Sequence, residues 1–173
     1  GTTTINAGTL AAGTLANAAS NSSIGTSGTL TIGSASAGIF SYTGGATSTN
    51  TNVTIGAGGG TIQNAGSGLL TLTGTINNAG NALTFNASSA NVTANGIISG
   101  AGTLTKQGNS SLTLGGANTY SGATSVSTGT LIANNNTALG TNSATVASGA
   151  ALQVNNGITV SNALSLNGSG VGG

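Results

Sequence analysis

Short runs in which two aliphatic residues flank one polar residue recur along the chain, and they limit the folds that it can adopt. An example is Leu-Thr-Leu at 70–72, and the others lie at 30–32, 53–55, 112–114, 152–154, 158–160 and 164–166. Alternation with a period of two puts one row of side chains inward and the other outward, as in a short β-strand. No stretch has the apolar spacing of an amphipathic helix. We therefore expect an all-β chain with essentially no α-helix.

These runs recur at a nearly constant step. Gly-Thr-Leu or Gly-Thr-Ile begins at positions 8, 13, 28, 60, 74, 102 and 129. Most steps between representative inward residues are roughly 20–23 residues long, within the range of known repeat families. These inward residues are Leu10, Leu30, Val53, Ile76, Ile98, Leu131 and Leu152. One longer step, from Ile98 to Leu131, predicts a locally different coil.

Short strands at such a step are typical of a parallel β-solenoid, in which each coil stacks on its neighbours. We expect one solenoid over residues 1–173, with about eight coils of roughly 20–23 residues. An antiparallel hairpin or sandwich assembly is the alternative, because Asn-Gly dipeptides at Asn95, Asn156 and Asn167 could form hairpin turns. The constant step and the brevity of the strands favour coils.

Composition limits the chemistry that the chain can perform. Of 173 residues only Lys106 is charged, and there is no Asp, Glu, His or Cys. Acid–base catalysis and metal binding depend mainly on those missing side chains, so we expect no enzymatic activity, no cofactor and no metal site. One cation cannot neutralise a row of phosphates, so nucleic acid is not an expected partner. No run of 18 apolar residues exists, so we expect no membrane-spanning helix.

Three side chains remain as candidates for a specific role. Lys106 could be a ligand or cross-link site, but we interpret it as a solvated, outward residue near a coil corner. Tyr42 and Tyr120 begin two similar segments, YTGGATS and YSGATS. They could stack on sugars, but we interpret each as covering a corner with its hydroxyl bonded to backbone.

Residues 100–131 contain the densest set of repeat features, and they resemble the autotransporter-associated β-strand repeat. The residues that carry the resemblance are Gly102, Leu104, Lys106, Leu112, Leu114, Tyr120, Gly122, Gly129 and Leu131. Residues 132–173 are similar to sequence that follows this repeat, whereas residues 1–99 match less specifically. The resemblance implies a right-handed parallel β-helix, exported by a Gram-negative bacterium and displayed extracellularly at the cell surface. In that family the repeat is scaffold and supplies no catalytic residues.

The leading functional hypothesis is a structural one, a β-solenoid segment of a surface fibre or passenger stalk. Neither end of the chain reads as a polar cap, so the expected partners are further coils of the same polypeptide or other copies stacked head to tail. The second hypothesis is an adhesin that binds surface glycan through a Thr/Asn face and the tyrosines. The third is ice binding through ranks of threonine.

Overall fold

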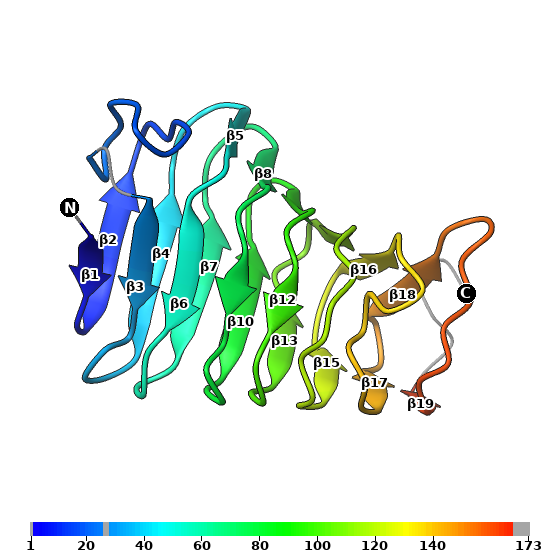
Figure 1. The fold of residues 1–173 in the computed structure, drawn as a ribbon. Helices are drawn as coiled ribbons and strands as arrows, with labels where there is room; N and C mark the ends of the chain where they lie inside the picture. Colours follow the sequence, from blue (N-terminus) through cyan, green and yellow to red (C-terminus); the bar gives the residue numbers. More distant parts are fainter. Residues whose placement is uncertain (1, 26–27, 168–173) are drawn as a thin grey trace.

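The structure is a computed structural model that describes residues 2–25 and 28–167. Over these residues the chain forms a three-faced parallel β-solenoid, and all 19 of its elements are strands (Figure 1). Every pairing between strands is parallel, so the antiparallel alternative is wrong for the described part of the chain. Asn95 and Asn156 lie at coil corners, and the third Asn-Gly dipeptide extends into residue 168, outside the described residues.

The strands form three sheets, which we call A, B and C. Sheet A contains β1 (Thr3–Ile5), β3 (Thr29–Ile32), β6 (Asn52–Ile55), β9 (Ile76–Asn77) and β12 (Ile98–Ser99). Sheet B contains β2 (Gly8–Ala12), β4 (Gly38–Tyr42), β7 (Gly60–Asn64), β10 (Leu83–Ala87), β13 (Leu104–Gln107), β15 (Thr124–Val126), β17 (Ala144–Val146) and β19 (Leu164–Leu166). Sheet C contains β5 (Thr47–Thr49), β8 (Leu70–Leu72), β11 (Val92–Ala94), β14 (Ser111–Leu114), β16 (Thr130–Ala133) and β18 (Ala151–Val154).

The number of coils is slightly smaller than expected. Only sheet B reaches eight strands, while sheets A and C have five and six. The solenoid therefore has about six turns, not eight. The run at 158–160 is not a strand, which corrects the sequence-based expectation. Sheet A ends at β12, so this run has no preceding strand with which to pair.

Inward side chains stack in columns from coil to coil. Leu30, Val53, Ile76 and Ile98 are in register on sheet A, as the constant step predicted. Leu131 instead follows Leu112 on sheet C, one coil later. The longer step from Ile98 to Leu131 thus joins two different sheets, and the prediction of an irregular coil there is wrong.

The irregular coil lies at the other end of the solenoid. Gly8 pairs with Gly38, a longer step than between other neighbouring strands of sheet B, because residues 13–25 leave the sheets and form a loop. This loop, blue in Figure 1, lies against β5: the Thr47 and Thr49 hydroxyls donate to the carbonyls of Leu15 and Ala16 at 3.1 and 2.7 Å. The loop therefore covers the edge of sheet C, and the expectation that neither end is capped is wrong at this edge.

The core is a narrow aliphatic column between the three sheets. Its members are almost all Leu, Ile, Val and Ala, with Phe40, Phe85, Tyr42 and Tyr120 as the buried aromatic residues. Backbone groups pair between coils along each strand, so the ladder satisfies the peptide groups without charged side chains. At the C-terminal edge Leu164 and Leu166 are 43% and 63% exposed, because no described strand follows β19.

Candidate functional site

Lys106 points into the solenoid and is fully buried, which corrects its interpretation as a solvated residue. Its ammonium donates to the carbonyl oxygens of Gln107, Gly108 and Thr128 at 2.9, 2.7 and 3.1 Å. Three protons thus meet three acceptors, one of them on the next coil. Burial lowers the pKa of Lys106 from 10.5 to about 8. The side chain acts as an internal clamp between coils, and its donors are already used.

The orientation of Lys106 follows from the strand alternation around it. In β13, Leu104 is buried and Thr105 is partly exposed, so the next residue must point inward. The alternation of inward and outward residues indicates this orientation from the sequence alone, but the general preference of lysine for solvent favours the opposite interpretation. Gly129 lies directly beside the ammonium with a φ of +69°, and a Cβ there would be 2.9 Å from the lysine Nζ. Only glycine fits this corner without strain.

The two tyrosines are buried, so neither is available to stack on a sugar. The Tyr42 hydroxyl donates to the Gly45 carbonyl at 2.7 Å, which confirms the predicted backbone anchor. The Tyr120 hydroxyl lies 2.6 Å from the Thr124 hydroxyl instead, and burial raises the pKa of Tyr120 to about 12. The similar segments are not structural equivalents: Tyr42 ends a sheet B strand, whereas Tyr120 lies in the connection before one.

The other repeat residues pack the interior. The four leucines at 104, 112, 114 and 131 are fully buried, so the inward assignment of Leu114 is confirmed. A Cβ at Gly102 would lie 1.8 Å from the Asn81 carbonyl oxygen, and one at Gly122 would lie 2.2 Å from the Gly102 carbonyl oxygen. The motif residues therefore have two roles. The leucines fill the core, and the glycines let the backbones of successive coils approach closely.

Three buried asparagines join successive coils, and Asn64 does so by donating to the Asn91 carbonyl at 2.8 Å. Asn78 accepts from the Gly102 amide at 2.9 Å and donates to the Gly102 carbonyl at 2.8 Å. Asn118 accepts from the Ile98 amide at 2.8 Å and donates to the Ala138 carbonyl at 2.7 Å. At the corners, where the strands end, these side-chain amides make the hydrogen bonds between coils that backbone groups make within the strands. In a chain rich in exposed asparagine, no local signal separates Asn64 and Asn78 from the rest, whereas Asn118 lies in the Asn-Thr-Tyr turn of the repeat segment 100–131.

The outer face of sheet B contains a column of hydroxyl groups in register. Its members are Thr61, Thr84, Thr105, Ser125, Thr145 and Ser165. None of these side chains has a hydrogen-bond partner among the described residues. A second column beside it has the amide side chains of Gln63, Asn86 and Gln107 in register. The face is polar and uncharged, and its hydroxyl column is unpaired.

At the β4–β10 end of this face lies an open depression of about 270 Å³. It exists because small residues occupy the corner before each strand, as at Ala37, Gly59 and Ala82. Thr61 and Thr84 border it. It is a recessed part of the hydroxyl face and a candidate for a ligand site.

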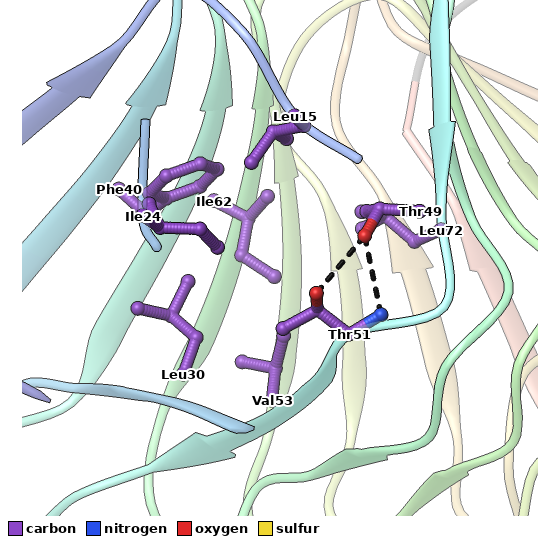
Figure 2. Close-up of a pocket in the computed structure, with 9 residues that line it drawn as sticks. All are labelled: Leu15, Ile24, Leu30, Phe40, Thr49, Thr51, Val53, Ile62 and Leu72. Atoms are coloured by element: carbon purple, nitrogen blue, oxygen red, sulfur yellow. Dashed lines mark hydrogen bonds between the residues drawn. The ribbon is translucent and has the colours of Figure 1, made fainter. Parts of the chain in front are cut away.

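A second, internal cavity is a packing defect. Figure 2 shows aliphatic side chains and Phe40 surrounding it, with Thr49 and Thr51 at one side. The Thr49 hydroxyl is 3.0 Å from the Thr51 hydroxyl and accepts from the Thr51 amide at 3.2 Å (Figure 2). The space for the centre of a water-sized molecule is only about 10 Å³, at the lower limit for one water. This cavity has no room for a ligand.

Two absences within residues 2–25 and 28–167 bear on the site. No three residues among His, Cys, Asp and Glu gather there as metal ligands would. The same residues contain no helix with the length and hydropathy needed to cross a bilayer.

Comparison with known proteins places the repeat in a class. The sequence model of the passenger-associated-transport-repeat family matches residues 1–12 and 104–133. The longer match covers β13, β14, β15 and β16, which include the lysine clamp and the stacked leucines. This match and the parallel solenoid fold together show that residues 104–133 are similar to an autotransporter-passenger repeat. No significant match was found among curated proteins or among solved structures.

Proposed function

We propose that the chain is a structural segment of an extracellular surface protein, the β-solenoid stalk of an autotransporter-like passenger or a similar surface fibre. The observation that supports this most is the family match over residues 104–133, in which every matched motif side chain serves the core or a corner. Leu112 and Leu131 fill the core, and Lys106 and Gly129 close a corner. These residues build a scaffold and leave no reactive group exposed.

The role is mechanical in this proposal. Hydrogen bonds between successive coils run along the solenoid axis, so a pull on the stalk loads the ladders of all three sheets at once. Because Lys106 is the only charged side chain, this ladder does not depend on surface ion pairs and is insensitive to salt. A stalk of this kind holds its shape at any ionic strength outside the cell.

Surface exposure is tested by inserting an epitope tag after Gly149 in the full-length protein. Gly149 is exposed, and a Cβ there would meet nothing within 4 Å. We expect a tag antibody to label intact Gram-negative cells that make the protein, and external protease to remove the label. Labelling only after permeabilisation would contradict the proposal.

End-to-end stacking of copies has weaker support than extension by further coils. Stacking would bring β18 against residues 14–24, which already cover the sheet C edge at β5. Among the described strands, β2 and β19 are the two terminal strands of sheet B. We therefore propose extension by further coils of the same polypeptide in preference to end-to-end stacking of copies. Electron microscopy at high concentration should show separate rods, and filaments with a one-chain repeat would show this inference to be wrong.

A further inference from the structure

The hydroxyl face of sheet B has the properties of a binding surface for a long, uncharged, polar ligand. Its six hydroxyl side chains lie on successive strands, about 4.8 Å apart. They have no partner within the described residues, so each remains free to donate and to accept. Gln63, Asn86 and Gln107 add amide donors and acceptors in a parallel column.

The depression gives this face a defined end. Its floor is formed by glycine and alanine backbone, and Ile39 contributes an apolar surface. The peptide groups there are already paired, as in the bond from the Gly60 amide to the Ala82 carbonyl at 3.0 Å. A flat apolar floor bordered by two hydroxyls suits a sugar ring, which has apolar C–H faces and a polar rim.

We propose that this face binds an uncharged polysaccharide, with one sugar ring in the depression and the chain running along the hydroxyl column. The volume of about 270 Å³ lies just below the roughly 300–1,000 Å³ of pockets for drug-sized ligands, so it accepts one ring. The remaining rings lie along β13, β15 and β17, where the strand spacing approximates the advance per ring of an extended glycan. This role is additional to the scaffold role and does not rest on it.

Charge determines which glycan fits. The depression and both columns contain no charged side chain, and the only cation of the chain, Lys106, is buried with three carbonyl partners. An anionic polysaccharide would lose hydration without gaining a counter-charge. A neutral chain exchanges hydrogen bonds with water for hydrogen bonds with hydroxyls and amides at little cost.

Ice is the competing ligand for a face of ordered threonines. An ice plane requires a flat array of equal groups in two directions. Here the second column has amides of two lengths, and the depression breaks the plane at one end. The geometry therefore favours a flexible chain over a crystal surface.

The experiment uses the purified protein and a printed panel of neutral and anionic polysaccharides, with a labelled chain as the probe. Ala82→Leu fills the depression from an exposed position directly before β10. Ala123→Leu is the matched control, because Ala123 is exposed directly before β15, outside the depression. Thr84→Val removes one bordering hydroxyl and keeps the side-chain shape, with Thr93→Val on sheet C as its control. Circular dichroism verifies that all four variants fold.

We expect binding to at least one neutral polysaccharide, weakened about tenfold or more by Ala82→Leu and unchanged by Ala123→Leu. Thr84→Val should weaken binding about fivefold, the effect of one hydrogen bond, and Thr93→Val should not change it. Three results would overturn the proposal: binding to no neutral polysaccharide, binding to anionic ones only, or equal effects of the site and control variants. Thermal hysteresis in a freezing assay without glycan binding would assign the face to ice instead.

Discussion

The coil from Gly8 to Gly38 is much longer than the coil from Leu104 to Thr124, although both belong to sheet B. In the long coil, residues 13–25 leave the ladder, and threonine hydroxyls on β5 bond to the loop. A small cavity remains beneath it. In the short coil, Leu104 and Lys106 are fully buried in the interior. The solenoid thus tolerates extra residues where side-chain hydroxyls replace backbone pairing.

The two regions should differ most in how much stability each loses when a carboxylate is introduced into its interior. Leu114→Asp places a carboxylate in a fully buried column, and the only basic side chain of the protein, Lys106, is already bonded to three carbonyls. We expect a loss of more than about 3 kcal/mol in the free energy of unfolding, measured by urea titration. Leu15→Asp should cost less, because Leu15 is on the surface loop and can turn outward. An equal loss in both variants would show that the loop is as integral to the stack as β14.

A titration separates the two regions next, because Lys106 and Tyr120, which both have shifted pKa values, lie in the short coil between Leu104 and Thr124. Lys106 has a folded pKa of about 8 against 10.5 unfolded, so the unfolded chain binds more protons between these values. Stability should therefore rise from pH 8 to pH 10.5, by up to about 3 kcal/mol. The pKa of Tyr120 is raised to about 12, so the unfolded tyrosine ionises first above pH 10. This contribution offsets the rise from Lys106 between pH 10 and pH 10.5, and stability should fall above pH 10.5.

The control for this titration is Lys106→Met, which removes the titrating group and keeps an unbranched side chain. Its stability should show no rise between pH 8 and pH 10.5. From about pH 5 to pH 8 both proteins should have constant stability, because the chain contains no Asp, Glu or His side chain. A pH-dependent rise that persists in the methionine variant would assign it to a group other than Lys106.

Two glycines with similar backbone angles give a finer comparison. Gly129 has a φ of +69° beside the lysine clamp, and Gly25 has a φ of +75° in the loop. A Cβ at Gly25 would meet nothing within 4 Å, whereas one at Gly129 would lie 2.3 Å from the Gly108 carbonyl oxygen. Gly25→Ala should cost about 1 kcal/mol from backbone strain alone, and Gly129→Ala at least about 1 kcal/mol more. If thermal unfolding shows that both variants lose the same stability, the corner at Gly129 can relax around a methyl group.

The smallest effect is expected at the cavity under the loop. Val53 lines it, so Val53→Ile adds one methyl group beside empty space. We expect stabilisation by less than about 1 kcal/mol. Leu112→Ile is the control in the tightly packed region and should be neutral or destabilising. If Leu112→Ile gained as much stability as Val53→Ile, the two regions would not differ in packing.

Sequence periodicity predicted the class of fold because stacked coils require inward residues at a constant step. Leu30, Val53 and Ile76 recur at a constant step since each must cover the residue one coil earlier. The step alone could not assign Ile98 and Leu131 to different sheets, because all three sheets have the same alternation. Lys106 was misplaced because its solvent preference was weighed above its phase in β13. The loop at 13–25 was unpredictable because its two core contacts, Leu15 and Ile24, resemble strand residues.

The central claim is that the coils are parallel and in register, and a distance between two spin labels tests it most directly. The chain has no cysteine, so Thr61→Cys and Thr145→Cys allow selective labelling on the outer face of sheet B. These positions are four strands apart in register, through Thr84, Thr105 and Ser125. Pulsed electron–electron double resonance should give a single distance of about 20 Å, four times the spacing between neighbouring strands. A broad distribution, or a distance beyond about 35 Å, would contradict the stacked register.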